Sequence, residues 1–216
     1  MASEQQQQQP IVHSQFDFDN IVVGEAKITK TPYGTVNLFI PMKYSETGSN
    51  DDTCDIEIQP PRLTLANELV EWADKNSSKK SYYIDYSFTS ESKPNKSKNF
   101  RNFVEQYENW CKNAIADHSE EWIGESLDRE LIDRVFSSCV RNNTNSLRTK
   151  VPMKFNQIKF DFVDVNDFYV NPSQMESGME VLPKFKTNGI WKFGDKWGSS
   201  WNTTFVKVFQ DMKNDG

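Results

Sequence analysis

The sequence is poor in the residues that most enzymes use for proton transfer and metal binding. Its 216 residues include only two histidines, His13 and His118, and histidine is the usual general base and metal ligand near neutral pH. No pair of cysteines or histidines has the spacing of a zinc site, and neither a glycine-rich phosphate loop nor a nucleophile elbow occurs. We therefore expect a protein that is not an enzyme and that carries no cofactor or metal.

Two acidic clusters are the remaining candidates for a metal site. Asp17 and Asp19 form one, and Asp161, Asp164 and Asp167 form the other; such carboxylates hold Mg²⁺ in metal-dependent nucleases. Each carboxylate lies among apolar residues, as the solvent-facing half of a strand or turn does. Alternation is the simpler explanation, so a nuclease is the weaker alternative.

Long apolar segments are also absent. No stretch approaches the roughly 20 apolar residues that a membrane span needs. The start, Met-Ala-Ser-Glu followed by five glutamines, lacks the basic and apolar parts of a signal peptide. We therefore expect an intracellular protein without membrane contact, with a disordered glutamine-rich lead-in over residues 1–15. In that setting its three cysteines, Cys54, Cys111 and Cys139, are expected to be free thiols.

Aromatic residues are abundant, and charge is unevenly distributed. Aromatics make up 13% of the chain, with 15 Phe, 7 Tyr and 6 Trp, and the net charge is −6. Residues 141–216 nevertheless hold 11 basic and 8 acidic residues. Because charges act mainly within about 8 Å at physiological salt, an acidic protein can still present a local basic groove.

The periodicity changes twice along the chain. Strand-like alternation over residues 16–58 and 81–88 gives way to two helical patterns, over 100–115 and 127–140, and returns after residue 150. This order predicts an α+β fold with a closed antiparallel sheet and an inserted pair of amphipathic helices. We expect one domain over residues 16–209, the helical insertion at about 98–141, and a flexible tail over 210–216.

The run from Gly189 to Trp201 interleaves rings with lysines. In a strand, Trp191 and Phe193 share one face and Lys192 points to the other. Exposed rings can stack on bases while lysines follow the phosphates. Trp191 and Trp201 are expected to pack in the core of a closing hairpin, which makes them weaker candidates for ligand contact.

Lys196 and Trp197 are the preferred ligand-binding residues of this run, because a turn at Gly194–Asp195 should leave Trp197 exposed. Further basic residues flank the predicted helices, and a ring at residue 33 lies at a predicted hairpin tip. The full set of predicted DNA-binding residues is Trp197, Lys196, Lys192, Trp191, Phe193, Tyr33, Lys98, Arg101, Arg148 and Lys150.

Four motifs stand out along the chain. They are Thr31-Pro32-Tyr33-Gly34 leading to Asn37-Leu38-Phe39-Ile40-Pro41, Ile58-Gln59-Pro60-Pro61-Arg62-Leu63, the stretch 82–88 before a helix, and Gly189-Ile190-Trp191 with Gly198 and Trp201. They resemble motifs of the putative single-stranded DNA-binding proteins of the nucleocytoplasmic large DNA viruses, the group that includes the African swine fever virus protein. The resemblance spans residues 16–208, and Pro60 stands where the family has Thr or Ser.

The resemblance implies an OB-like β-barrel core and sequence-independent binding of single-stranded DNA, with RNA as an alternative ligand. It further implies a role in viral DNA replication, recombination or repair, in the host cytoplasm (the viral factory) or the virion. Self-association and viral replication proteins are further candidate partners. The alternative from another class is a non-enzymatic adaptor or virion component, in which the rings form a patch for a protein partner.

Overall fold

The computed structural model describes residues 9–30, 36–47, 49, 52–73, 80–89, 94–155 and 157–209. The fold is mixed α+β, mostly sheet with two α-helices, which confirms the expected class. The strands form one 14-stranded sheet and one separate pair, β12 with β13. The strands are β1 (Ile11–Val12), β2 (Ile21–Val23), β3 (Lys27–Lys30), β4 (Val36–Tyr44), β5 (Ile56–Gln59), β6 (Leu63–Leu65), β7 (Val70–Ala73), β8 (Lys80–Ser87), β9 (Phe136–Ser137), β10 (Val140–Arg141), β11 (Ser146–Val151), β12 (Met153–Lys154), β13 (Gln157–Ile158), β14 (Asp161–Val163), β15 (Glu180–Phe193) and β16 (Lys196–Val208).

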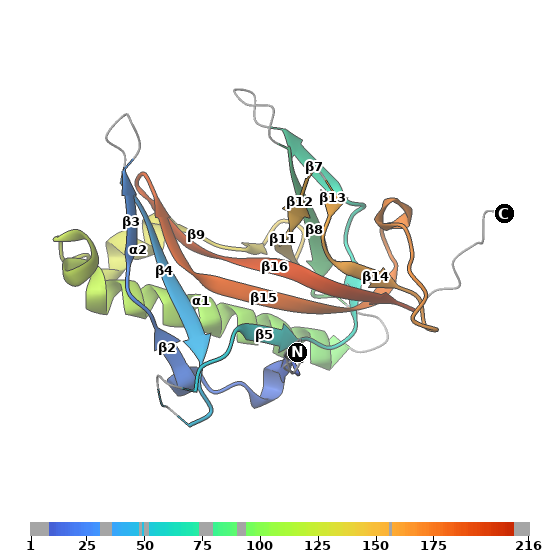
Figure 1. Cartoon of the computed structure of the whole chain (residues 1–216), viewed down its shortest axis with the longest axis horizontal. Coiled ribbons are helices and arrows are strands. Elements are labelled where there is room, and N and C mark those ends of the chain that lie inside the picture. The colour runs from blue at the N-terminus through green and yellow to red at the C-terminus, as the bar shows by residue number, and fades with distance from the viewer. Residues whose placement is uncertain are drawn as a thin grey trace, which may run out of the picture.

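The long antiparallel hairpin of β15 and β16 is the centre of the sheet (Figure 1). The free edge of β15 pairs in turn with β6, β5 and β4. The free edge of β16 pairs with β9, β11 and β14. Each long strand therefore pairs with several short strands from distant parts of the sequence. As a result, side chains that are far apart in the sequence lie on one surface.

The strand pairings form a closed circuit, β15–β6–β8–β11–β16 and back to β15. The link between β11 and β16 is one residue pair, Lys150 with Asn202. Buried hydroxyls meet inside the circuit: Thr203 Oγ1 lies 2.7 Å from Thr149 Oγ1 and 3.2 Å from the hydroxyl of Tyr86. These hydrogen bonds satisfy polar groups that burial would otherwise leave unpaired.

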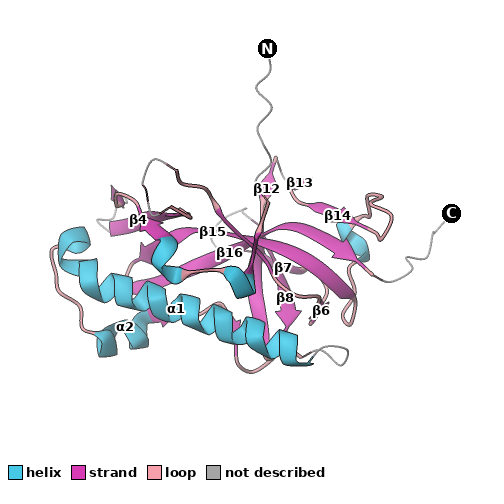
Figure 2. Ribbon diagram, turned by 90° about the horizontal axis from the view of Figure 1, so that it is seen from below, coloured by secondary structure: helices cyan, strands magenta, loops and turns pink. Residues whose placement is uncertain are grey.

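The helix α1 (Pro94–Ile123) lies along one face of the hairpin, beside α2 (Arg129–Val135), as Figure 2 shows. Residues three and four apart on α1 form one buried stripe. Tyr107 packs at 4.6 Å from the ring of Trp201, and Trp122 packs at 6.5 Å from that of Trp197. Burying these large rings is the main favourable contribution of the helix to the fold. The remaining helices are the 3-10 turns η1 (His13–Gln15), η2 (Phe18–Asn20) and η3 (Pro172–Gln174).

The second predicted helix, over residues 127–140, is longer than the helix in the structure. The helical pattern ran to Val140, but α2 ends at Val135 and Phe136 begins β9, parallel to β16. The apolar spacing continues because Phe136, Cys139 and Val140 still pack against the core from a strand and a bend. The spacing of apolar residues alone therefore does not distinguish a continuing helix from a strand followed by a bend.

The predicted disordered lead-in over residues 1–15 is wrong for its last part, which has regular structure. Residues 11–12 form β1, parallel to β5, and the ring of His13 lies 5.4 Å from that of Phe100 on α1. Residues 1–8 and 210–216 lie outside the described residues. The three cysteines are free thiols, as expected. Within the described ranges, no helix is both long and apolar enough to span a membrane.

Candidate functional site

The two faces of the central hairpin have different roles. Cross-strand partners point to the same side of an antiparallel sheet, and successive pairs alternate. The pair Thr187–Trp201 faces α1, whereas the pairs Trp191–Gly198 and Phe193–Lys196 face the opposite side. We call the side turned away from α1 the outer face. On the outer face, Trp191, Phe193 and Lys196 are turned away from α1 and can meet a large ligand.

Trp197 is not the exposed ring that the sequence suggested. It is 1% exposed and packs against Trp122. The turn of the hairpin consists of Gly194 and Asp195, so Lys196 already begins β16 and the next residue points inward. The prediction that Trp197 touches a ligand from the turn is therefore wrong. Trp201 is buried, as expected.

The neighbouring residues follow the strand alternation. Lys192 faces α1: its Nζ donates to the carbonyl of Gly194 and lies 6.0 Å from the centre of the Trp197 ring. Phe193 is 64% exposed on the outer face, and its cross-strand partner Lys196 is also exposed. Phe193 and Lys196 thus stay together at the tip of the outer face, while Lys192 does not join them.

Trp191 crosses from β15 over β16. A Cβ atom at Gly198 would lie 2.5 Å from Cζ2 of the Trp191 ring, so the indole rests directly on this glycine. Gly198 pairs on its other side with Ser137 of β9. The half-buried indole therefore reaches toward the segment 137–141, and its other cross-strand neighbour is Phe39 on β4.

A cavity of about 140 Å³ lies beside the Trp191 indole. Its walls come from β8, β11, β16 and the segment 137–141, which are distant in sequence. On β11, Lys150 stands opposite Tyr83 of β8, and the guanidinium of Arg148 lies 5.7 Å from the centre of the same tyrosine ring. Arg141 of β10, the neighbour of β11, also lines the cavity. Rings and cations from four elements thus surround one small space.

The cations of this cavity differ in their partners. Arg148 donates two hydrogen bonds of 2.7 Å to Asp85, a carboxylate whose side chain is 2% exposed, and this raises the pKa of the arginine. In the described part of the chain, the side chains of Arg141 and Lys150 have no hydrogen bond or ion pair. Burial raises the pKa of Cys139 to about 12, although the positive charges of Lys150 and Arg141 act to lower it. Both cations and this thiol belong to residues that line the cavity.

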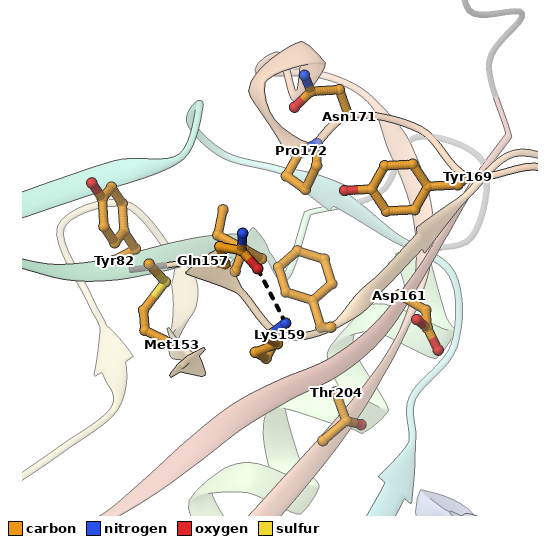
Figure 3. A pocket seen from close by; sticks show the side chains of 11 residues that line it. Tyr82, Met153, Gln157, Lys159, Asp161, Tyr169, Asn171, Pro172 and Thr204 are labelled. Carbon is orange, nitrogen blue, oxygen red and sulfur yellow. Dashed lines mark hydrogen bonds between the residues drawn. The ribbon is translucent and has the colours of Figure 1, made fainter. Parts of the chain in front are cut away.

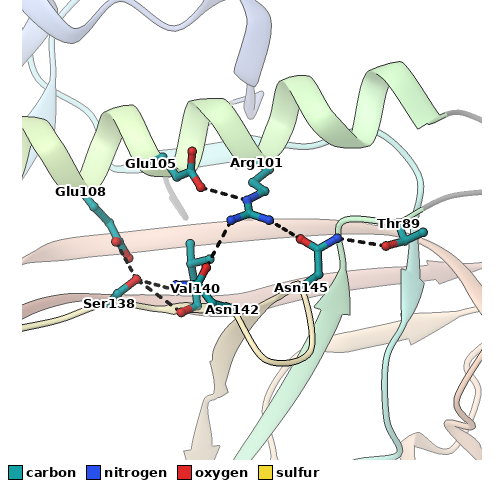
Figure 4. A network of polar contacts seen from close by, with 8 residues as sticks. All are labelled: Thr89, Arg101, Glu105, Glu108, Ser138, Val140, Asn142 and Asn145. Atoms are coloured by element: carbon teal, nitrogen blue, oxygen red, sulfur yellow. Dashed lines mark hydrogen bonds and ion pairs between the residues drawn. The ribbon is translucent and has the colours of Figure 1, made fainter.

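A buried acid on α1 holds the wall of the cavity in place (Figure 4). Glu108 accepts hydrogen bonds of 2.7 Å from the hydroxyl of Ser138 and from the backbone N–H of Cys139. Burial raises the pKa of Glu108, and these hydrogen bonds oppose the rise. The carboxylate faces the backbone of this segment, so it fixes the segment between α1 and the outer face.

The predicted basic residues on α1 do not belong to this surface. Arg101 donates to Glu105, Asn142 and Asn145, and so fastens the helix to the loop before β11 (Figure 4). Lys98 is exposed on α1, which packs on the other side of the hairpin. Neither converges on the outer face. The predicted ring Tyr33 lies outside the described residues.

A second, larger pocket of about 890 Å³ opens among β8, β12, β13, β14 and η3 (Figure 3). Tyr82, Phe160 and Tyr169 contribute rings to its lining, and Lys159 and Asp161 contribute charges. None of the predicted DNA-binding residues lines this pocket, and Asp161 was considered only as a metal ligand. The sequence signal for it is weak, because its walls combine short strands with irregular loops.

The acidic cluster near this pocket is explained by local structure. Asp164 accepts hydrogen bonds from the backbone N–H groups of Asn166 and Phe168, and Asp167 is paired with Lys207. No group of three or more metal-ligating side chains occurs within the described residues. The carboxylates stabilise a turn, which agrees with the simpler explanation above.

Neither the protein-family models nor the curated protein sequences compared with this chain give a match.

Proposed function

We propose that the protein binds single-stranded nucleic acid, DNA in the first place, on the outer face of the β15–β16 hairpin. One observation carries the proposal: Trp191, Phe193 and Tyr83 share this side of the sheet with Lys150 and Lys196, two cations that form no ion pair with any described residue. Bases stack on exposed rings whatever their sequence, and cations follow the phosphates. This combination suits an unpaired strand better than a duplex, whose bases are already stacked.

The spacing of the rings supports the same function. Trp191 and Phe193 are two residues apart on one strand face, which places them roughly 7 Å apart along β15. Adjacent bases of an extended strand could then occupy adjacent rings, with Lys196 beside Phe193 for a phosphate. Figure 1 shows β4 crossing the hairpin near its turn, and β7 and β8 rising from the hairpin on the side away from α1.

We further propose that the closed circuit of strands is an OB-like core. In favour of this are the five-strand path β15–β6–β8–β11–β16 and the helix α1 packed against its central hairpin. Together with the motif resemblance, this supports a role in viral DNA replication, recombination or repair. The role rests on the resemblance and on the outer face together.

Binding of fluorescently labelled oligo-dT, followed by anisotropy at low salt, tests the function. We expect saturable binding that weakens as salt rises. The protein displaces counterions from the DNA phosphates when it binds, and the free energy gained from their release is smaller at higher salt. Phe193→Ala should cost about 1–3 kcal/mol of binding free energy, and Lys196→Glu should weaken binding further at low salt. Phe168→Ala, which removes an equally exposed ring near the larger pocket, is the matched control. Absence of oligo-dT binding at low salt would refute the function.

A protein-adaptor function has a separate observation in its favour. Among the described residues, four of the eight exposed large hydrophobic side chains fall between residues 155 and 169: Phe155, Val165, Phe168 and Tyr169. Exposed apolar groups that lie together are typical of protein-binding surfaces. None of these four residues belongs to β15 or β16. Phe168→Ala combined with Tyr169→Ala should therefore weaken capture of viral replication proteins and leave oligo-dT binding unchanged.

A further inference from the structure

Trp72 on β7 points to the same side of the sheet as Tyr83 on β8. In the register of these two strands, Val70 is opposite Tyr83 and Trp72 is opposite Ser81. Opposite residues of an antiparallel pair point to the same side, and so do residues two apart on one strand. Trp72 is therefore a diagonal neighbour of Tyr83 on the outer face. Such neighbours are about 7–8 Å apart, which is within reach of aromatic side chains.

A row of side chains connects Trp72 with Trp191 across the strands. Tyr83 is opposite Lys150 on β11, and Lys150 is opposite Asn202 on β16. Tyr83, Lys150 and Trp191 line the same cavity of about 140 Å³. From β7 through β8, β11 and β16 to β15, the row covers roughly 19 Å at about 4.8 Å between strands. The outer face thus continues from the hairpin to β7 as a row of rings with a cation among them.

The fold makes little use of the Trp72 ring. The side chain is 55% exposed, and β7 pairs with β8 alone. Within the described residues, no other aromatic ring packs against it. A single exposed apolar side chain is ordinary by itself. Trp72 differs from such a case because it lies beside the ring of Tyr83, in line with Trp191.

The charges on this part of the outer face favour a polyanion. Glu71 points to the opposite side of β7, where it forms an ion pair of 2.8 Å with Lys80. Asp85 is the only acid of β7, β8 and β11 on the outer face, and Arg148 neutralises it through two hydrogen bonds of 2.7 Å. Lys150 forms no ion pair with any described residue. The row therefore has a net positive charge.

We propose that the bound single strand crosses the sheet from Phe193 at the tip of the hairpin to β7, where Trp72 stacks on a base at the end of the path. This rests on the proposed function and adds to it a further binding residue and the course of the strand. Lys150 lies between Tyr83 and Trp191 and contacts a phosphate. The path is roughly 26 Å long, which at about 7 Å between neighbouring rings takes about five nucleotides. That length is within the range of about 4–16 nucleotides for one OB fold.

An oligo-dT of about twelve nucleotides, which exceeds the length of the path, tests Trp72 by anisotropy at low salt. Trp72→Ala should weaken binding about fivefold or more, the equivalent of one stacked base. Trp72→Phe keeps a ring and should retain most of the affinity. Ile28→Ala is the matched control, since Ile28 is 56% exposed on the edge strand β3 but lines a cavity with Trp122 of α1, on the opposite face. It should leave the affinity unchanged.

The indole resonances of the ¹⁵N-labelled wild type give a second measurement that depends on no substitution. As the same oligo-dT is added, the Nε1–H signal of Trp72 should move with a saturable dependence. The signal of Trp122, a ring that is 6% exposed and faces the hairpin from α1, should stay nearly in place.

The path and the function can fail separately. If Phe193→Ala weakens oligo-dT binding while Trp72→Ala binds like the wild type, or if the Trp72 signal does not move, the path to β7 is refuted and the function stands. Equal losses in Trp72→Ala and Ile28→Ala also refute the path, because the loss is then not specific to the outer face. If oligo-dT does not bind at all, the path and the function are both refuted.

Discussion

The indole of Trp191 rests on the backbone of Gly198, its cross-strand neighbour, so closely that a Cβ atom at residue 198 would lie 2.5 Å from Cζ2 of the ring. This contact allows a ring rooted in β15 to cross β16 and form one wall of the cavity. A glycine is needed here for space, since any side chain would push the ring away from the sheet. The position of the Trp191 ring on the outer face therefore depends on the absence of a side chain at Gly198.

Gly198→Ala is therefore expected to displace Trp191 without changing any charge. Overpacking of this kind costs about 1–3 kcal/mol of stability, measurable by urea unfolding. Oligo-dT affinity should fall together with the fluorescence response of the tryptophan. Ser173→Ala, at an exposed serine of η3 away from the outer face, is the control and should leave both the unfolding free energy and the oligo-dT affinity nearly unchanged. Unchanged oligo-dT affinity in Gly198→Ala would exclude Trp191 from the binding surface.

The contact between Trp191 and Gly198 also shows why the last sequence motif could be recognised. Gly189, Gly198 and Trp201 carried the motif resemblance, and each has a packing reason in the structure. A Cβ at Gly189 would lie 1.9 Å from the carbonyl oxygen of Ile40, in a backbone conformation with φ of +149°. Trp201 packs against Tyr107 of α1. These residues are therefore needed for the packing of the hairpin. A motif made of them indicates the fold of the protein more directly than it indicates the ligand.

Strand alternation predicted correctly to which side of the sheet the side chains of β15 point. It did not predict this correctly for β16, after the turn. It placed Lys192 opposite Trp191 and Phe193, as the structure has them. It did not establish where β16 begins, and a shift of one residue moves a side chain to the other face. Trp197 was misplaced for this reason. The cavity was beyond prediction, because it joins Tyr83, Lys150 and Trp191 through pairings that local patterns do not encode.

The inward position of Trp197 predicts a large effect on stability. Trp197→Ala removes a ring buried against Trp122 and should cost about 3–5 kcal/mol in urea unfolding. Trp72→Ala, at a tryptophan that is 55% exposed, is the comparison and should change stability by no more than about 0.5 kcal/mol. If Trp197→Ala does not fold, Trp197→Phe should still show a partial loss. Equal stability of the Trp197 and Trp72 variants would contradict the buried position.

The ion pair of Arg148 with Asp85 predicts a structural role for an arginine that the sequence assigned to DNA. Arg148→Ala leaves a buried carboxylate without its partner, which typically costs about 3–5 kcal/mol. Adding Asp85→Asn should restore much of that loss, because the unpaired charge is then gone. Lys150→Ala, two residues along the same strand, should be nearly neutral for thermal stability. Absence of any rescue in the double variant would show that the loss arises from packing.

The buried Glu108 predicts a specific dependence of stability on pH. Burial raises its pKa in the folded protein above the usual value, so the folded state holds the proton more tightly than the unfolded chain does. The associated stability is fully present below the unfolded pKa of about 4.3 and is lost as pH rises through the raised folded pKa. Glu108→Gln keeps the shape and an acceptor for the N–H of Cys139 but cannot ionise. The unfolding free energy of the wild type, measured relative to Glu108→Gln across this window, should therefore fall with rising pH and then level off. A difference that stays constant from pH 4 to pH 8 would show that Glu108 is not desolvated, and that the wall of the cavity is held in another way.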